Sequence, residues 1–352
     1  YVQQEDPVDE EALRRCATVY MPTGPVHMIP ERISTDLASL NEGMKRPSFC
    51  TIIEFNRSGG ILATRICRAV TQVHRRLDYD EADELIADGT GEYAERLRIL
   101  EKICDAQTDK RLDEGAMIFS KTELKVRVTD DEIMMKALQT VTPSRNIISE
   151  LMILCNSTTA DFAKQNDIPI IYRAQIEPED PARRYMGQVV KDTNPNVFRG
   201  LKRGRLSLHP QPHSGLGLQA YTQVTSPLRR FGDLVMQRQI AAFLNDEEYP
   251  YTSANLLEVI GNAETVEREN RAIERRCTRY WELEHLRREG EDKEYEGVVM
   301  SKMPGAYMVA LKPWPVRGRM VAKDNLKFGS TIKVRFSNLN PPLSVIKLEQ
   351  VP

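Results

Sequence analysis

The spacing of apolar and polar positions divides the chain into a mixed front part and a short end rich in strands. Apolar residues at helical spacing, together with cap and turn signals, predict helices over 7–17, 79–105, 131–140, 146–166, 226–245 and 253–289. Alternation predicts strands over 49–56 and 61–69, joined by the turn sequence Asn56-Arg-Ser-Gly-Gly60, and a further strand pair within 116–128.

The end of the chain changes character after the charged linker 289–294. Short β-like stretches follow at 295–300, 307–311, 317–321, 331–336 and 343–348. Five short strands in so few residues are typical of a small OB-type barrel. We therefore predict an α+β fold with two domains, a mixed domain over 1–290 and an all-β barrel over 291–352.

A helix start at Thr225-Ser-Pro-Leu-Arg-Arg carries an unusual charge. We expect Ser226 to cap the helix and Pro227 to occupy its first position. Arg229 and Arg230 would then lie in the first turn, where the helix dipole favours anions. Two interpretations stay open at this point. The arginines may bind a phosphate at the helix end, or one of them may pair with Asp233 on a surface helix.

Composition narrows the classes of function. Of the 352 residues, 28% are charged, and the net charge is −2. This charge balance excludes a uniformly basic nucleic-acid-binding protein, so any nucleic acid must bind in a local groove. The six cysteines form no CxxC pair, so we expect reduced thiols in an intracellular protein and no zinc site. No apolar run approaches the roughly 18 residues of a membrane-spanning helix, so we expect no membrane association.

Several motifs together resemble one family. The stretch Tyr221-x-x-x-Thr-Ser-Pro-Leu-Arg-Arg-Phe-Gly-Asp-Leu234 resembles the most characteristic motif of the RNB exoribonucleases, the ribonuclease II and ribonuclease R family. Further similar segments occur in family order at 15–22, 76–80, 150–156 and 171–173. Each segment is weak evidence alone, but the ordered set is specific and covers about the first 290 residues.

The resemblance implies a hydrolase that removes nucleotides from the 3′ end of single-stranded RNA as 5′-monophosphates, with two divalent ions, here Mg²⁺, held by an aspartate cluster. In the family that cluster precedes the segment matched by 15–22. Only fourteen residues precede Arg15 and they do not contain the cluster. We therefore expect the metal ligands outside this sequence, and the chain to be an internal piece of a longer protein. The acidic stretches 78–83 and 130–132 are interpreted as helix starts instead of metal sites.

Five site residues follow from the resemblance. Arg229 is expected near the scissile phosphate, as a catalytic residue, with Arg230 as a second RNA-binding candidate. Tyr79 and Glu150 match residues linked to positioning of the 3′ end and to ribose recognition. Tyr20 matches an aromatic that stacks near the terminal bases. From the sequence alone, Tyr20 may equally be a core residue and Glu150 a solvent-facing helix residue.

The remaining RNA-binding candidates lie in the basic stretch 199–205 and in the barrel. Arg203 represents the basic stretch as a phosphate contact. The barrel resembles the S1-type RNA-binding domain that follows the catalytic domain in the family. Tyr307, Trp314 and Phe336, interleaved with basic residues, are candidate stacking rings. A core position is the alternative for Phe336, and Tyr307 and Trp314 are the stronger surface candidates.

Two departures and two alternatives accompany this interpretation. Gln175 and Gln237 stand where the family often has histidine. The partner is expected to be single-stranded RNA, the protein a monomer, and its compartment a bacterial cytoplasm or an organelle matrix. The alternative within the family is a non-catalytic RNA-binding member. An alternative from another class is a scaffold of helices and an OB-type barrel without RNA affinity.

Overall fold

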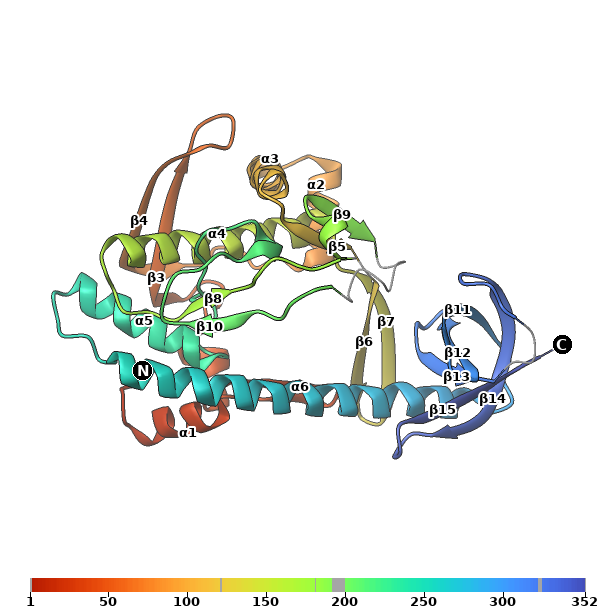
Figure 1. Ribbon diagram of the computed structural model, residues 1–352. Coiled ribbons are helices and arrows are strands. Elements are labelled where there is room, and N and C mark those ends of the chain that lie inside the picture. The colour runs from red at the N-terminus through yellow and green to blue at the C-terminus, as the bar shows by residue number, and fades with distance from the viewer. Residues whose placement is uncertain (1, 121, 181, 192–199, 322–324, 352) are drawn as a thin grey trace. The chain divides into compact units, whose positions relative to one another are not determined.

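The structure, a computed structural model, describes residues 2–120, 122–180, 182–191, 200–321 and 325–351. The chain divides into two compact units, and Figure 1 labels their elements. Unit 1 comprises Tyr1–Thr18, His27–Lys121 and Thr140–Arg268, and unit 2 comprises Val19–Val26, Thr122–Gln139 and Glu269–Pro352. The predicted α+β class with a terminal barrel is confirmed, while the proposed domain boundary after residue 290 stays a prediction.

Unit 1 combines helices with small two-stranded sheets. Its helical elements are α1 (Pro7–Arg15), the π-helix η1 (Ile33–Leu37), α2 (Tyr79–Asp88), α3 (Glu92–Asp113), α4 (Pro143–Gln165), the 3₁₀ turns η2 (Ala182–Tyr185) and η4 (Ser214–Leu216), α5 (Phe231–Leu244) and the start of α6 (Ser253–Glu289). Its strands are β3 (Lys45–Phe55), β4 (Ile61–Gln72), β5 (Met117–Ser120), β8 (Tyr172–Ala174), β9 (Gln188–Lys191) and β10 (Arg205–Ser207).

The core of unit 1 is built around α5. Phe231, Met236 and Ile240 are almost fully buried there and belong to one cluster with residues of α1, α4 and α6. Helix α4 begins at Pro143, three residues before the predicted start, because Thr142 accepts a hydrogen bond from the Arg145 amide and a proline occupies the first helical position. The apolar core thereby fixes α4, which carries Glu150, and α5, which directly follows Arg229 and Arg230.

The predicted hairpin over 49–69 is confirmed as β3 and β4, which pair antiparallel. Asn56 closes its turn, since its side-chain oxygen accepts from the amides of Ser58 at 3.0 Å and Gly60 at 2.8 Å. The strand pair expected within 116–128 is wrong in its partners: β5 pairs in parallel with β9, and β6 (Thr122–Thr129) pairs with β7 (Glu132–Gln139).

The predicted helix over 131–140 is wrong, because this stretch is strand β7 of unit 2. Asp130 and Asp131 have φ values of 49° and 65°, the left-handed conformation that a tight hairpin turn requires. They are therefore a turn and not a helix start. Ile133 and Met135 are buried with exposed residues between them, so the true period is two.

The remaining strands of unit 2 are β1 (Val19–Met21), β2 (Gly24–Val26), β11 (Tyr295–Met303), β12 (Ala306–Lys312), β13 (Arg317–Met320), β14 (Thr331–Asn340) and β15 (Val345–Gln350). The last five close into a barrel in the order β11-β12-β13-β15-β14, with β13 and β15 parallel, as Figure 1 shows. This is the OB-type arrangement that the sequence predicts. Phe336 lies in its core.

Candidate nucleic-acid interface

The segment before α5 is a tight turn, so the predicted helix start at Ser226 is wrong. Helix α5 begins at Phe231, and Arg230 is its extended N-cap residue with φ −143° and ψ 120°. Backbone pairing with the segment after α1 prevents an earlier start: Thr18 donates to the Arg229 carbonyl at 3.1 Å and Phe231 donates to the Cys16 carbonyl at 2.8 Å. These bonds hold both arginines in a fixed, non-helical backbone.

Arg230 pairs with Asp233, which confirms one of the two pairings considered from sequence. Arg230 Nε and Nη2 donate to the two carboxylate oxygens at 2.9 and 2.6 Å, and the Ser226 amide donates to Oδ2 at 2.8 Å. Asp233 is only 2% exposed. Burial raises the pKa of this carboxyl, and the Arg230 guanidinium opposes the rise. Arg230 therefore neutralises a buried carboxylate inside the protein.

Arg229 differs from its neighbour in both exposure and contacts. Its side chain is exposed, and among the described residues its guanidinium makes no hydrogen bond or ion pair. The backbone at this position is fixed, because the Arg229 amide donates to the Ser226 carbonyl at 3.1 Å and its own carbonyl accepts from Thr18. The result is an unpaired cation on a rigid turn, a suitable donor for a phosphate group.

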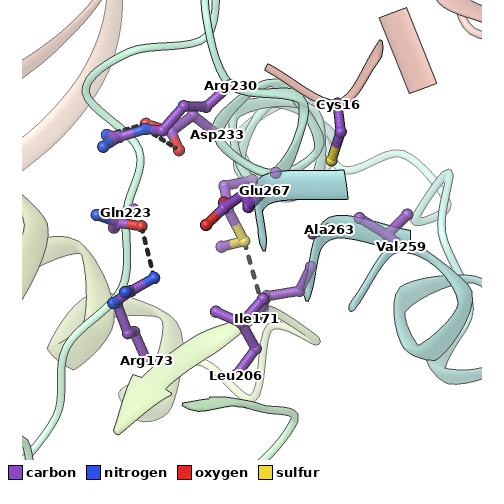
Figure 2. A pocket seen from close by; sticks show the side chains of 12 residues that line it. Cys16, Ile171, Arg173, Leu206, Gln223, Arg230, Asp233, Val259, Ala263 and Glu267 are labelled. Carbon is purple, nitrogen blue, oxygen red and sulfur yellow. Dashed lines mark hydrogen bonds and ion pairs between the residues drawn. The ribbon is translucent and has the colours of Figure 1, made fainter. Parts of the chain in front are cut away.

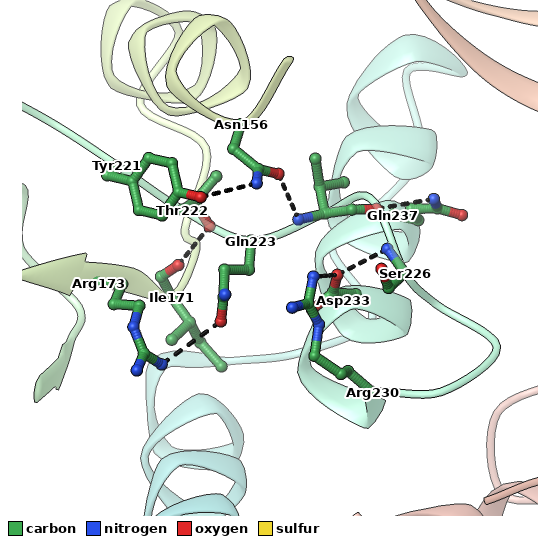
Figure 3. A network of polar contacts seen from close by, with 11 residues as sticks. Asn156, Ile171, Arg173, Tyr221, Thr222, Gln223, Ser226, Arg230, Asp233 and Gln237 are labelled. Carbon is green, nitrogen blue, oxygen red and sulfur yellow. Dashed lines mark hydrogen bonds and ion pairs between the residues drawn. The ribbon is translucent and has the colours of Figure 1, made fainter. Parts of the chain in front are cut away.

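A buried polar network holds the preceding residues (Figure 3). Asn156 of α4 donates to the Tyr221 hydroxyl at 3.0 Å and accepts from the Val224 amide at 3.0 Å. The Thr222 hydroxyl donates to the Ile171 carbonyl at 2.6 Å. Asn156 and Thr222 are 2% and 0% exposed. Because an unmade buried hydrogen bond costs about 1–3 kcal/mol, the network strongly favours one backbone path.

The two glutamines at expected histidine positions are part of the same framework. Gln237 Nε2 donates to the Val224 carbonyl at 3.0 Å. Gln175 Nε2 donates to the Lys202 carbonyl at 2.6 Å, and its Oε1 accepts from the Gly215 amide at 3.2 Å. Both side chains form hydrogen bonds with backbone groups, so in this chain they stabilise the local backbone conformation.

A small cavity of about 40 Å³ adjoins the network (Figure 2). Arg230 with Asp233 and Arg173 with Gln223 lie along its wall, together with Leu206 of β10 and apolar residues of α6. The Arg173 guanidinium is 3.4 Å from the Gln223 side-chain oxygen. A volume of this size has room for a water molecule or two and not for a nucleotide. This cavity is therefore not the substrate site.

Glu150 is buried, which contradicts the solvent-facing alternative. It is 3% exposed and forms an ion pair with Arg111 of α3, itself 7% exposed. Arg111 Nε donates to Oε2 at 3.0 Å and Nη2 donates to Oε1. Sequence reasoning missed Arg111, because it lies in a charged helix end, Asp109-Lys-Arg-Leu, that resembles an ordinary solvated face.

A cavity of about 220 Å³ lies beside this pair, and both Arg111 and Glu150 line it. Glu150 and Arg145 of α4 both line it, with Phe119 of β5. The Arg145 guanidinium carbon lies 4.1 Å from the ring centroid of Tyr79, a cation–π contact. Tyr79 is 38% exposed. Arg145 thus contacts Tyr79 and lines the same cavity as Glu150, whereas neither Tyr79 nor Arg229 lines this cavity.

Tyr20 and Arg203 lie on the surface of their separate units. Tyr20 of β1 is 52% exposed, which contradicts the core alternative, and its amide donates to Glu274 Oε1 at 2.7 Å. Arg203 is exposed next to Lys202, which pairs with Glu179 at 2.7 Å. Arg199 of the same basic stretch lies outside the described residues.

The barrel corrects one predicted stacking residue. Tyr307 is 5% exposed, its hydroxyl lies 3.2 Å from Asn325 Oδ1, and it accepts from the Leu326 amide at 3.3 Å. A buried ring offers no face to a base, so the expectation of a surface Tyr307 is wrong. Trp314 is half-buried and packs edge-on against His285, with ring centroids 5.9 Å apart.

The outer face of the barrel carries basic residues that the structure brings together. Arg319 and Lys347 are direct partners in the parallel pair of β13 and β15, and both are exposed. Arg317 lies on the same face, two residues along β13. Like charges directly opposite each other are unfavourable unless an anion lies near them. Lys347 was missed from sequence, because only the barrel closure places it beside Arg319.

The acidic residues at 78–83 stabilise helices, as expected. Asp78 caps α2 and accepts from the Glu81 amide at 2.8 Å, and Asp83 accepts from the Ser144 amide at 2.8 Å. Within the described ranges, no group of three or more His, Cys, Asp or Glu side chains could hold a metal ion. The residues present therefore do not fit a metal centre by themselves.

Two further expectations can be compared with the described residues. All six cysteines are free thiols, and burial raises the pKa of Cys16 and of Cys104 to about 12. Among the helices of the described part, none is long and apolar enough to cross a bilayer.

The fold and its motif-bearing segment match a known domain family. The model of the RNB domain matches residues 1–246, so this chain belongs to the RNB domain family, whose curated relatives include ribonucleases II and R. One relative is the chloroplastic and mitochondrial ribonuclease II of Arabidopsis thaliana, 25% identical over 100% of this chain and 45% of its own length. An uncharacterized ribonuclease of Synechocystis is 29% identical over 84% of this chain and 44% of its own length. The chain thus spans less than half of either relative.

Solved structures share the fold. Apo ribonuclease R of Mycoplasma genitalium superposes with a TM-score of 0.84 at 19% identity, over 100% of this chain and 65% of that one. An active-site mutant of the Dss1 exoribonuclease of Candida glabrata gives 0.86 at 21% identity, over 100% of this chain and 48% of that one. The yeast pseudonuclease Ssd1 gives 0.65 at 18% identity, covering 100% and 47%.

Proposed function

We propose that this chain belongs to a 3′→5′ exoribonuclease that hydrolyses single-stranded RNA to nucleoside 5′-monophosphates. The observation that carries the proposal is Arg229, an exposed guanidinium without a partner among the described residues, on a turn fixed by a buried network. Family membership supports the reaction class, and structures of a related ribonuclease R were solved with single-stranded and double-stranded RNA.

In this proposal Arg229 contacts the scissile phosphate. Its guanidinium would stabilise the charge that develops on the phosphate oxygens during hydrolysis, and a fixed backbone removes the cost of reorganising it. Arg230 plays an indirect part, since its ion pair with Asp233 stabilises the first turn of α5 next to the turn that carries Arg229. Only one of the two arginines is therefore assigned to the phosphate.

Ribose recognition is assigned to the cavity beside Glu150. A carboxylate accepts hydrogen bonds from ribose hydroxyls, and the 2′-hydroxyl is the group that distinguishes RNA from DNA. The cavity of about 220 Å³ is lined by Glu150 and by Arg145, which stacks on Tyr79. Tyr79 is proposed to position the RNA end through this stacked pair.

The proposed RNA path uses further exposed groups on each unit. Tyr20 supplies an exposed ring and Arg203 an exposed cation. On the barrel, Arg319 and Lys347 supply neighbouring charges, and Trp314 retains a partly exposed ring. We propose S1-type RNA binding for this barrel on these residues, without Tyr307.

Magnesium dependence is kept as a proposal, with ligands on polypeptide outside these residues. The described residues include no cluster of His, Cys, Asp or Glu side chains that could bind a metal. The monomeric state and an intracellular compartment, a bacterial cytoplasm or an organelle matrix, also remain predictions.

A non-catalytic RNA-binding protein is the second candidate. One observation favours it: the pseudonuclease Ssd1 shares this fold. Such a protein would keep Arg229 as a binding residue for the RNA backbone and would lack hydrolysis.

Degradation of RNA labelled at its 5′ end separates the two candidates. With Mg²⁺ we expect the full-length protein to shorten the RNA stepwise and to release mononucleotides, and chelation should stop the reaction. The 352-residue chain alone should bind the RNA without cutting it. Binding without release by the full-length protein would favour the second candidate, and the absence of RNA binding would contradict both.

A further inference from the structure

The buried pair of Arg111 and Glu150 connects three segments that are distant in sequence. Besides its two bonds to Glu150, Arg111 donates through Nη1 to the Leu216 carbonyl at 3.1 Å. The pair therefore joins α3, α4 and the turn η4 that precedes the family motif. The Glu150 carboxylate cannot turn without breaking two charge-assisted hydrogen bonds.

Close backbone packing holds Arg111 itself in place. Gly217 has a φ of +64°, and a Cβ at this position would lie 2.5 Å from the Arg111 carbonyl oxygen. That carbonyl also accepts from the Ala116 amide at 2.8 Å. Only a glycine allows this approach without strain, so the end of α3 is seated firmly against η4.

The carboxylate keeps unused acceptor capacity on its cavity side. Two carboxylate oxygens offer about four lone-pair sites, and Arg111 occupies two of them. Glu150 also lines the cavity of about 220 Å³. A pair of neighbouring acceptors at fixed spacing matches the two adjacent hydroxyl donors of a terminal ribose.

We propose that Arg111 is a positioning residue that orients Glu150 to accept hydrogen bonds from ribose hydroxyls of bound RNA. The inference rests on the proposed function, because Glu150 must face a ribonucleotide. A planar guanidinium fixes both oxygens at once, which the single ammonium group of lysine does not. Stability alone does not require the pair, since apolar residues often replace buried ion pairs without loss.

The experiment compares binding of two oligonucleotides, identical except for ribose or 2′-deoxyribose at the 3′-terminal residues, by fluorescence anisotropy. We expect the unmodified chain to prefer ribose. Glu150→Gln and Arg111→Lys should each reduce this preference at least about tenfold, the effect of a lost hydrogen bond to a charged group. Arg96→Lys on the same helix is the control, because Arg96 pairs with exposed Glu92 at the surface and should keep the preference.

A fourth variant separates positioning from direct contact and removes both buried charges, which protects folding. Arg111→Met/Glu150→Gln should show the same preference as Glu150→Gln alone, because Arg111 acts through Glu150. A further loss in the double variant would mean that Arg111 touches RNA itself and would overturn the proposal. Arg111→Lys with normal preference beside a defective Glu150→Gln would also overturn it, leaving the proposed function intact. An unmodified chain that binds neither oligonucleotide would instead contradict the proposed function.

Discussion

The motif-bearing segment 221–233 and the C-terminal barrel fix their side chains by different forces. The backbone path of the segment is determined by hydrogen bonds to buried polar groups, namely Asn156 of α4 and Asp233. In the barrel, an apolar interior that includes Leu311 and Met320 determines which side chains face outward. A polar network fixes the position of a single functional side chain. An apolar core determines only which side chains face outward, so many of them can contact a ligand.

This difference predicts different consequences of mutation. A change in the polar network should affect stability strongly, because each partner left behind is buried and unsatisfied. A change on the outside of the barrel should affect RNA affinity in small steps and leave stability nearly constant. The predictions below test this contrast.

The largest expected effect is on stability, in Arg230→Ala. The variant leaves the Asp233 carboxylate buried without its ion pair, and we expect a loss of about 3–5 kcal/mol in the free energy of unfolding, measured by urea denaturation. Arg229→Ala is the matched control, and it should change stability by less than about 0.5 kcal/mol because the side chain is exposed. Equal stability of the two variants would contradict the assigned contacts.

The structure around the motif-bearing segment 221–233 should also lose stability in acid, through protonation of His213. Burial, reinforced by the Arg173 charge, lowers the pKa of His213 from 6.5 to about 4. The folded state therefore binds fewer protons than the unfolded state between these values, so stability is present above pH 6.5 and falls as the pH drops towards 4. The expected loss is about 2–3 kcal/mol.

Hydrogen exchange at the amides of 221–224 measures this effect along a pH series, after correction for the intrinsic exchange rate. His213→Gln should flatten the dependence of stability on pH, whereas replacement of the exposed His74 should leave it unchanged. A slope that survives in His213→Gln would assign the acid sensitivity to another group.

Tyr307→Phe tests the interior of the barrel. The variant removes the hydroxyl that binds Asn325 and the Leu326 amide. We therefore expect a loss of about 1–1.5 kcal/mol in the free energy of unfolding of the barrel, measured from its melting transition. RNA affinity should stay unchanged, because the ring is buried. A clear loss of affinity at full stability would restore Tyr307 to the RNA-binding surface.

The smallest effect is expected on the outside of the barrel. Arg319→Ala and Lys347→Ala should each weaken RNA binding several-fold, about 1 kcal/mol, and lower the salt dependence by about one charge. Arg335→Ala is the matched control, since Arg335 already pairs with Glu349 at 2.5 Å. If all three variants lose affinity equally, the barrel binds RNA through its overall charge and not through this pair of strands.

The sequence predicted those parts that hydrophobic spacing determines. The barrel strands, the hairpin β3–β4 and the helices α4 and α6 follow from local patterns, and of the two alternatives for Phe336 the core position is confirmed. The strand β7 was mistaken for a helix, because the turn signal Asp130-Asp131 was interpreted as a helix start.

The parts that failed depend on contacts across the fold. Helix α5 starts late because residues 16–18 form backbone hydrogen bonds with the turn that carries Arg229 and Arg230, and no local pattern reveals that pairing. The partner of Glu150 lies 39 residues away on another helix, in a stretch that resembles solvated surface. The motif predicted a role for both arginines, and only the structure distinguishes Arg230, which pairs with Asp233, from Arg229, which makes no hydrogen bond or ion pair among the described residues.

The most direct test of this distinction is the rate of nucleotide release at saturating RNA by full-length Arg229→Ala. We expect the rate to fall about 10²–10³-fold, as for removal of a group that stabilises transition-state charge, with the melting temperature unchanged and RNA affinity nearly so. Arg229→Lys should be intermediate, because it keeps the charge and loses the two-point contact. Nucleotide release at the unmodified rate by Arg229→Ala would contradict the assignment of this guanidinium to the scissile phosphate.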